Sequence, residues 1–213
     1  MSLSKVLITG SGSGLGKHLA KLFSKKGHEI ILHGRNEENL LLTQKEIRKD
    51  GVKSKYIVAD LSIEDDIINL CEEAKKENIK ILINNAGITC PNLEFKKISF
   101  EIIENMIKVN TIAPIKIINF LNPILKYVIN INSMVGMEAK KNRTLYAASK
   151  WGLRGFSESL KKEECSFNIL DVYPTNIKTW PERENAMEVD YVVNYIYDSM
   201  LKNKSEIILD GRK

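Results

Sequence analysis

Three side chains with reactive polar groups fall at positions where one fold could bring them together. Tyr146 and Lys150 lie four residues apart in the sequence YAASK. If this segment is helical, residues i and i+4 project from the same helical face. Ser133 ends the apolar run NINS, and ligands of open α/β sheets bind beyond the carboxyl ends of the strands. A hydroxyl, a phenol and an ammonium group could therefore act on one substrate.

A glycine-rich segment favours the binding of a phosphate group. The sequence TGSGSGLG, residues 9–16, follows the first expected strand and opens the first expected helix. Glycines permit a tight turn and let backbone N–H groups approach a pyrophosphate, whose charge is favoured at a helix N-terminus. This is the context that a dinucleotide-binding turn requires, and the alternative is a turn without a ligand. His18 follows Gly16 and Lys17, so a phosphate loop ending in Gly-Lys-Ser/Thr is not supported.

The end of the second expected strand indicates which dinucleotide would bind. An acidic residue near this point binds the ribose 2′-hydroxyl of NAD, whereas an arginine accommodates the 2′-phosphate of NADP. The strand ends in the sequence HGRN, in which Gly34 offers no carboxylate and Arg35 supplies a planar cation. NADP(H) is therefore preferred and NAD(H) is possible. The alternative is that Arg35 caps a loop and faces solvent.

These groups must be positioned by alternating strands and helices. Short β-branched runs alternate with segments of helical periodicity, which is the pattern of βαβ units. Strands are expected at Lys5–Thr9, Glu29–His33, Ser54–Ala59, Lys80–Ile83, Tyr127–Ile131, Asn168–Val172 and Glu206–Leu209. Helices are expected at Gly14–Lys26, Glu37–Asp50, Ile63–Glu77, Phe100–Leu121, Leu145–Glu164 and Val189–Asn203. The pattern predicts an α/β, Rossmann-type, doubly wound parallel sheet of about seven strands with helices on both faces.

Two finer expectations concern burial and capping. The strands should be buried on both faces, because crossover helices cover both sides of a parallel sheet. Ser62, followed by an acidic first turn, should be the N-cap of the third helix. With neither an internal repeat nor a linker, residues 1–213 are expected to form a single domain with a short substrate loop near 180–187.

Composition excludes several classes of function. Of the 213 residues, 43% are hydrophobic and 28% are charged, as in compact soluble proteins. The apolar runs are too short for a membrane span, and the first strand leaves no room for a secretory signal, so a cytoplasmic location is expected. The net charge of +5 is spread among acidic residues, which argues against nucleic acid as a partner. Three scattered cysteines and three histidines without partners at ligand spacing predict no metal site.

Several motifs in one order resemble those of a known family. These are T-G-x-x-x-G-x-G at residues 9–16, NNAG at residues 84–87, and then Asn110, Ser133, Tyr146 and Lys150. A tyrosine four residues before a lysine is common by chance, whereas the whole ordered set is not. On these residues the chain is identified as a member of the short-chain dehydrogenase/reductase family, over most of its length, from the first strand to about Thr179.

The resemblance implies a reaction and a role for each of the four polar residues. The reaction is hydride transfer between a nicotinamide and the carbonyl or secondary alcohol of a small molecule. Tyr146 would protonate the developing alkoxide while Ser133 donates a hydrogen bond to the same oxygen. Lys150 would stabilise the phenolate and hold the cofactor ribose. Asn110 would help to hold a water linked to Lys150, unless it is a polar helix residue bonded to backbone.

The same resemblance implies a set of cofactor contacts. Asp60 and Leu61 should lie beside the adenine, unless Asp60 is a plain capping or turn residue. A segment after the sixth strand should embrace the nicotinamide carboxamide, although Thr175 stands where a glycine is usual and tolerates positive φ poorly. The full expected set is Gly10, Ser11, Ser13, Gly14, Leu15, Gly16, Arg35, Asn36, Asp60, Leu61, Asn85, Ala86, Gly87, Tyr146, Lys150, Pro174, Ile177 and Thr179.

The departures from the family pattern leave some questions open. The substrate loop is short, which motivates an alternative function, a non-catalytic nucleotide-binding regulatory or scaffold protein. Trp180 either packs over the nicotinamide or substrate, or anchors its loop, and Cys90 is read as an incidental thiol. A homodimer through the helices at Phe100–Leu121 and Leu145–Glu164 is implied by the resemblance. The identity of the substrate is beyond the sequence.

Overall fold

Runs of β-branched and aliphatic residues form a parallel sheet that supports the predicted site. The computed structural model describes residues 3–49, 51–89, 94–179 and 184–212. Within these residues the main sheet has seven strands in the order β3-β2-β1-β4-β5-β6-β9, all parallel. Their bounds are β1 Lys5–Ile8, β2 Glu29–Gly34, β3 Ser54–Val58, β4 Ile81–Asn84, β5 Tyr127–Ile131, β6 Asn168–Pro174 and β9 Glu206–Leu209.

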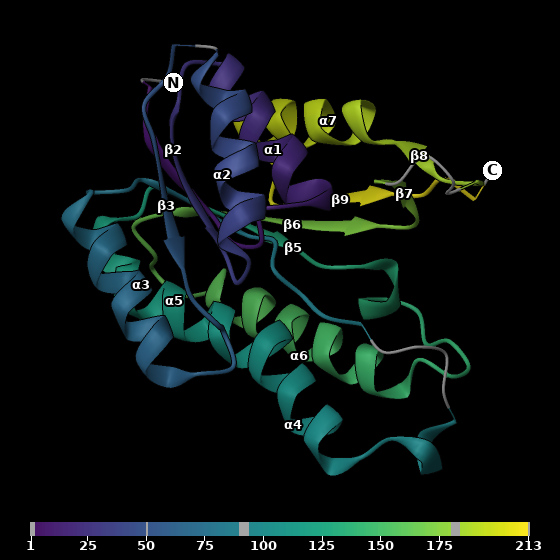
Figure 1. Ribbon diagram of the computed structural model, residues 1–213. Helices are drawn as coiled ribbons and strands as arrows, with labels where there is room; N and C mark the ends of the chain where they lie inside the picture. Colours follow the sequence, from purple (N-terminus) through teal and green to yellow (C-terminus); the bar gives the residue numbers. More distant parts are fainter. Residues whose placement is uncertain (1–2, 50, 90–93, 180–183, 213) are drawn as a thin grey trace.

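Helices cover both faces of this sheet (Figure 1). One face carries α1 (Gly14–Lys25), α2 (Glu37–Arg48) and α7 (Val189–Leu201). The other carries α3 (Glu64–Lys76), α4 (Phe100–Ile107), α5 (Ala113–Leu121) and α6 (Thr144–Leu160). The strand order starts in the middle of the sheet and runs outward to both edges. The predicted Rossmann-type doubly wound fold is therefore confirmed.

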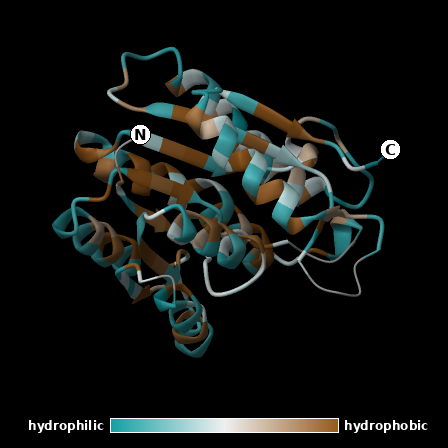
Figure 2. Ribbon diagram, turned by 90° about the horizontal axis from the view of Figure 1, so that it is seen from above, coloured by the Kyte–Doolittle hydropathy of each residue, from teal (hydrophilic) through white to brown (hydrophobic). Residues whose placement is uncertain are grey.

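Two apolar layers hold the helices on the sheet. Val6, Ile8 and Phe23 belong to the layer under α1, α2 and α7, whereas Leu7 and Leu82 belong to the layer under α3 and α5. Figure 2 shows the strands as mostly hydrophobic ribbons between helices with hydrophilic outer faces. Among the described residues no helix has the length and apolar character that crossing a bilayer requires.

Burial of the strands on both faces holds in the middle of the sheet and fails at its edges. All residues of β4 and β5 are buried, whereas every residue of the edge strand β3 is at least partly exposed. On the other edge strand, β9, Ile207 and Leu209 are buried but Glu206 and Ile208 are exposed. The prediction was wrong for these two strands because an edge strand has a neighbour on one side alone and incomplete helix cover.

Two local predictions about helices were also wrong. Ile63, and not Ser62, is the N-cap of α3, because the Ser62 backbone and hydroxyl both donate hydrogen bonds to the Asp60 carboxylate, at 2.8 Å each. The expected long helix over residues 100–121 is divided by a π-helical turn, η2 (Lys108–Ile112), between α4 and α5. Pro114 lies in the first turn of α5, where a missing N–H is tolerated.

Short elements complete the fold. The 3-10 turns are η1 (Phe95–Lys97), η3 (Asn122–Ile124) and η4 (Met134–Gly136). A second, two-stranded sheet pairs β7 (Ile177–Lys178) with β8 (Met187–Glu188), which the sequence pattern did not predict. This pair lies at the start and end of the region expected to hold the substrate loop. Trp180 and the residues to 183 lie outside the described residues.

A row of buried polar side chains crosses the neighbouring strands β4, β5 and β6 on the α6 side. Asn84, Asn130 and Asp171 are register partners on β4, β5 and β6. The Asn84 amide donates to Asn130 at 2.9 Å, and the Asn130 amide donates to Asp171 at 3.0 Å. The Asp171 carboxylate also accepts from Ser157 and Lys161, both at 2.6 Å. The row is thus hydrogen-bonded from the centre of the sheet to the surface.

Candidate active site

The glycine-rich turn after β1 is held by close backbone approaches that only glycine allows. Gly10 has a φ of +65°, and a Cβ there would stand 2.9 Å from the Ala86 Cα. A Cβ on Gly16 would overlap the Gly10 carbonyl, so the first turn of α1 packs directly on the loop. Gly14 has a φ of +54°, which other L-residues rarely adopt. These glycines therefore let backbone groups come close together, as the sequence pattern predicts.

The first turn of α1 is suited to an anion. Ser13 is the N-cap in an extended conformation, and its side chain makes no capping hydrogen bond. The turn that follows carries Gly14, Leu15, Gly16 and Lys17, without an acidic residue among them. Ser13 and Leu15 line a cavity, so the positive end of the helix dipole lies beside it, which favours a phosphate there.

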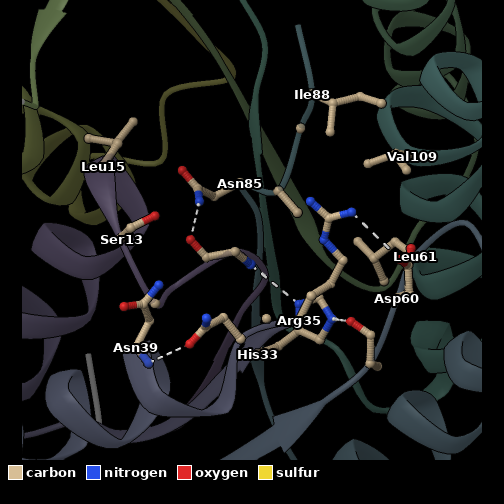
Figure 3. Close-up of a pocket in the computed structure, with 17 residues that line it drawn as sticks. Ser13, Leu15, His33, Arg35, Asn39, Asp60, Leu61, Asn85, Ile88 and Val109 are labelled. Carbon is tan, nitrogen blue, oxygen red and sulfur yellow. Dashed lines mark hydrogen bonds and ion pairs between the residues drawn. The ribbon is translucent and has the colours of Figure 1, made fainter. Parts of the chain in front are cut away.

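A cavity of about 770 Å³ lies along the carboxyl ends of β1 to β4 (Figure 3). That volume is within the usual range for cofactor sites. The structure brings ten of the predicted cofactor residues to its walls, namely Gly10, Ser13, Leu15, Arg35, Asn36, Asp60, Leu61, Asn85, Ala86 and Gly87. The walls also include residues that the sequence analysis did not select: Gly12, His33, Gly34, Asn39, Ala59, Ile88 and Val109.

The other predicted cofactor residues lie outside the wall of this cavity. Ser11 is buried behind the turn, where its hydroxyl accepts from the His33 N–H at 2.9 Å. Gly14 and Gly16 shape the turn from beside it, and Thr179 lies next to Gly14, with its Cβ 4.0 Å from the Cβ position of that glycine. Pro174 and Ile177 are at the ends of β6 and β7.

Arg35 and Asp60 meet across the mouth of the cavity. The Arg35 Nη1 lies 3.6 Å from the Asp60 Oδ2, and the Arg35 side chain is 63% exposed. Burial acts to raise the pKa of Asp60, but hydrogen bonds from Ser62 and the positive charge of Arg35 outweigh it and lower the pKa. Asn36 is the N-cap of α2, since its Oδ1 accepts from the Asn39 N–H at 2.9 Å.

Ser133, Tyr146 and Lys150 come together at the carboxyl end of β5. Ser133 follows that strand, and Tyr146 and Lys150 lie one turn apart on α6. The Ser133 hydroxyl lies close enough to the Tyr146 phenol to act on its pKa. The Lys150 Nζ lies 5.8 Å from the centre of the Tyr146 ring and donates to the Ile131 carbonyl at 3.0 Å. The three predicted groups thus share one location.

Burial sets the protonation of this group. It raises the pKa of Tyr146, while the neighbouring Ser133 hydroxyl and the positive charge of Arg143 act in the opposite direction. Burial lowers the pKa of Lys150 to about 8. The phenol therefore keeps its proton at neutral pH, and the ammonium group loses its proton more readily than an exposed lysine does. Such a pair is suited to acid/base chemistry.

Asn110 lies in the π-helical turn and is 1% exposed. Its Oδ1 accepts from the Ile88 N–H at 2.8 Å, and its Nδ2 donates to the Ile88 carbonyl at 2.9 Å and to the Ser149 hydroxyl at 3.0 Å. The structure therefore gives Asn110 the backbone-bonded arrangement that was the alternative expectation. It also lies close to the site, because a Cβ on Gly87 would be 3.3 Å from its Oδ1 and 3.8 Å from the Lys150 Nζ.

Two further residues, to which the sequence analysis gave no role of their own, support the site. The Asn132 amide donates to the Lys150 carbonyl at 3.1 Å and its Oδ1 accepts from the Ser133 N–H at 2.9 Å. The Thr9 hydroxyl oxygen accepts from the N–H groups of Asn85 and Ala86, both at 3.0 Å. Both are polar residues directly after a buried strand, and that position was a usable signal.

Thr175 does not disturb the segment that follows β6. It is not among the described non-glycine residues with positive φ, so the usual glycine is not required for the conformation found here. Its hydroxyl accepts from the Gly211 N–H at 2.8 Å and lies 3.3 Å from the Leu209 carbonyl. Thr175 thus ties the end of β6 to the chain that follows β9.

The remaining expectations about metals and cysteines concern few residues. In the ranges that the structure describes, no group of three or more His, Cys, Asp or Glu residues is placed to hold a metal. Cys71 and Cys165 are free thiols, and burial raises the pKa of Cys71 to about 12. Cys90 lies outside the described residues.

Comparisons with known proteins agree with this geometry. Residues 4–188 match the model of the family described as short chain dehydrogenase. The chain belongs to the short-chain dehydrogenase/reductase family. Members of this family are NAD(P)-dependent oxidoreductases that act on alcohol and ketone groups, so the chain is an enzyme of this type. The family predicted from the ordered motifs is therefore confirmed.

Three similar proteins illustrate the relationship. Nodulation protein G of Rhizobium sp. (strain N33) is 35% identical over 78% of this chain and 69% of the relative. The 3-oxoacyl-[acyl-carrier-protein] reductase FabG of Aquifex aeolicus is 34% identical over 77% of this chain and 69% of its own. The solved short-chain dehydrogenase from Sphingobium yanoikuyae, in complex with NADPH, is 27% identical, with a TM-score of 0.88 and coverage of 97% and 87%.

Proposed function

We propose that the protein is an NADP(H)-dependent oxidoreductase that interconverts the carbonyl group and the secondary alcohol of a small molecule. The observation that carries this proposal is that Ser133, Tyr146 and the buried Lys150 lie together at the end of β5, with the Lys150 Nζ 5.8 Å from the centre of the Tyr146 ring. The group lies at the sheet edge that also holds the cofactor-sized cavity. Membership of an oxidoreductase family supports the same reading.

The cavity has features that fit a dinucleotide. The positions of Gly10 and Gly16 leave backbone surface that a Cβ would fill, and the first turn of α1 offers N–H groups to a pyrophosphate. Asp60 and Leu61 would lie beside the adenine, and Asn85, Ala86 and Gly87 beside its ribose. When bound, the nicotinamide supplies or accepts the hydride.

In the direction of reduction, the chain's own residues handle the oxygen and the proton. Ser133 and Tyr146 would donate hydrogen bonds to the carbonyl oxygen, so that negative charge developing there is stabilised. Tyr146 then gives up its phenolic proton, which it holds at neutral pH because burial raises its pKa. The Lys150 ammonium group would stabilise the phenolate left behind and provide a proton to restore it.

The preference for NADP(H) rests on the end of β2. Arg35 stands at the mouth of the cavity with its side chain 63% exposed, and no carboxylate stands at Gly34 to repel a 2′-phosphate. The Asp60 carboxylate lies 3.6 Å from the Arg35 guanidinium and holds it over the cavity. In that position the guanidinium could bind a phosphate bidentately. NAD(H) would lack this contact and bind more weakly.

The test is the substitution Tyr146→Phe, followed with NADPH and a panel of ketones and aldehydes. The wild-type protein is expected to oxidise NADPH with at least one carbonyl compound. The variant should lose nearly all turnover, at least a hundredfold, because the proton donor is gone, while NADPH binding stays within about threefold. If the wild-type protein binds NADPH but turns over no member of a broad panel, the result contradicts the proposed activity and supports a non-catalytic nucleotide-binding protein.

The proposal extends to the domain organisation, the location and the oligomeric state of the enzyme. Residues 1–213 would form one cofactor-binding domain with its substrate loop near 180–187, acting in the cytoplasm without nucleic acid or membrane. Free thiols at Cys71 and Cys165 support a reducing compartment. A homodimer through residues 100–121 (α4, η2 and α5) and α6 would cover the exposed apolar side chains of Phe100, Ile112 and Trp151 on that side.

A further inference from the structure

One wall residue of the cavity, His33, is a buried histidine to which neither the motifs nor the proposed reaction gives a role. It is the second-last residue of β2 and is 2% exposed. Its ring lies between the turn after β1 and the end of β3 (Figure 3). The Gly10 N–H donates to its Nδ1 at 3.3 Å, and its Nε2 lies 3.2 Å from the Ala59 carbonyl oxygen.

These two partners admit one form of the imidazole. A backbone N–H can only donate and a carbonyl oxygen can only accept. The Nδ1 must therefore be unprotonated and the Nε2 must carry the proton. A charged ring would place a second N–H against the Gly10 N–H, so protonation would break the contact with the glycine turn.

The surroundings of the ring favour this neutral form. Burial lowers the pKa of His33 to about 4, although the hydrogen bond to Ala59 and the carboxylates of Asp60 and Asp66 act in the opposite direction. The ring is therefore neutral at the pH of a cell. Its hydrogen bonds do not change across the physiological range.

The backbone of His33 also forms hydrogen bonds with the same turn. Its N–H donates to the Ser11 hydroxyl at 2.9 Å, and its carbonyl accepts from the Ser11 N–H at 2.9 Å. On the opposite side of the turn, the Asn85 amide donates to the carbonyls of Thr9 and Gly10 at 2.9 and 3.1 Å. The glycine turn is thus clamped from β2 by His33 and from β4 by Asn85.

We propose that His33 is a positioning residue for cofactor binding: its neutral ring fixes the distance between the Gly10 amide and the Ala59 carbonyl. The first group shapes the pyrophosphate turn, and the second precedes Asp60 and Leu61 at the adenine end. His33 therefore sets the width of the cavity where the adenosine diphosphate half would lie. This inference rests on the proposed cofactor site and assigns the ring no contact with reacting atoms.

The test compares variants that keep different parts of the ring's hydrogen bonding. His33→Asn keeps an acceptor where Nδ1 stands, His33→Gln keeps a donor where Nε2 stands, and His33→Leu keeps neither. The matched control is His28→Leu, just before β2, because His28 is also 2% exposed and its Nε2 lies 3.2 Å from the Tyr197 hydroxyl. The Kd of NADPH, the thermal midpoint and the kcat at saturating NADPH are measured for each.

The expected result separates affinity from turnover. His33→Leu should raise the Kd of NADPH roughly tenfold, the factor that corresponds to one lost hydrogen bond. Its kcat at saturating NADPH should stay within about twofold, and His33→Asn should recover most of the affinity. His28→Leu should lower the thermal midpoint and leave the Kd unchanged. A folded His33→Leu that binds NADPH like wild type would overturn the inference.

Two further measurements test the role of His33 if the Leu variant does not fold. If His33→Leu does not fold, the Asn and Gln variants are compared, and equal NADPH affinity in the two would overturn the inference. Nitrogen NMR of the cofactor-free protein reads the tautomer directly, and a proton on Nδ1, or a charged ring at pH 7, would overturn it as well. Failure of wild type to bind NADPH would instead contradict the proposed function.

Discussion

Lys150 is a buried basic residue of the candidate site, with a strongly lowered pKa. The residue is 4% exposed, and burial lowers its pKa to about 8, against about 10.4 in an unfolded chain. Between these two values the unfolded state binds more protons than the folded state, so the free energy of unfolding rises with pH. Below about pH 8 the folded protein carries the full cost of the buried charge.

The substitution Lys150→Met removes this pH dependence. Because Met keeps the straight apolar chain without the charge, the variant is expected to gain stability relative to wild type at pH 7. That advantage should shrink by up to about 3 kcal/mol between pH 7 and pH 10.5, as wild-type Lys150 loses its proton. Urea unfolding of both proteins across this range gives the difference, and a constant difference would contradict the burial argument.

Arg35 is expected to read the 2′-phosphate of the cofactor. Arg35→Ala should raise the Kd of NADPH roughly 10- to 100-fold, because it removes a charge-assisted and bidentate contact. The Kd of NADH should change by less than about threefold. Titration followed by nicotinamide fluorescence measures both. The control is Arg48→Ala, an exposed arginine at the far end of α2, and equal binding of both cofactors by wild type would refute the NADP preference.

The sequence predicted those residues of the site whose spacing is set by a local turn or helix, and it missed those whose partners are distant in the chain. Gly10 and Tyr146 were found because a turn or a helix fixes the spacing of their neighbours in the sequence. His33 and Asn132 were missed because their roles depend on partners from other strands, such as Ala59 and the Lys150 carbonyl. The sequence does not show which backbone groups surround a histidine that precedes Gly34, because these groups come from distant parts of the chain.

Among the elements, the π-helical turn η2 decides how Asn110 meets the loop after β4. A π-turn widens the helix locally, and such turns are frequent at functional sites. Here it directs the Asn110 amide to both backbone groups of Ile88 and to Ser149. The loop carrying Gly87 is thereby attached to the helix layer beside Lys150.

Asn110→Ala should therefore destabilise the protein. It leaves the Ile88 N–H and carbonyl without their partner, which should lower the free energy of unfolding by roughly 2–4 kcal/mol. Asn119→Ala, an exposed asparagine on α5, is the control and should change it by less than about 0.5 kcal/mol. Denaturant unfolding measures both. Equal effects would show that the Asn110 hydrogen bonds carry no net stability.

The order and type of the elements followed from periodicity, but their ends and irregularities did not. Apolar spacing continues from Phe100 to Leu121 across the π-turn, so the pattern alone predicts one long helix. Pro114 was a signal in that stretch that the spacing argument did not use. Ser62 has the right residue type for an N-cap, yet the neighbouring Asp60 carboxylate takes its hydrogen bonds. Such competition between neighbours is decided by geometry.

For the whole molecule, the main prediction concerns its assembly. Phe100 is 85% exposed, and Ile112 and Trp151 are 39% and 47% exposed on the same side of the sheet. A homodimer through residues 100–121 and α6 would bury them, so the mass in solution should be twice 24.2 kDa. Phe100→Glu should shift the protein toward monomer by placing a charge in that interface.

The control for this prediction lies on the opposite face of the sheet. Leu201, at the end of α7, is 42% exposed, and Leu201→Glu should leave the mass unchanged (Figure 1). Light scattering at several concentrations measures both variants. A monomeric wild type, or a dimer insensitive to Phe100→Glu, would remove the proposed interface.

The polar row from Asn84 through Asn130 to Asp171 also bears on how the sheet assembles. If β5 joined β4 one residue out of place, Asn130 would lie beside Ile83, and its amide would be buried away from Asn84. The same slip between β5 and β6 would set Asp171 beside an isoleucine. Its carboxylate would then be buried without the hydrogen bond from Asn130. Each such error is costly. The row therefore makes the observed register of β4, β5 and β6 more stable than a pairing shifted by one residue.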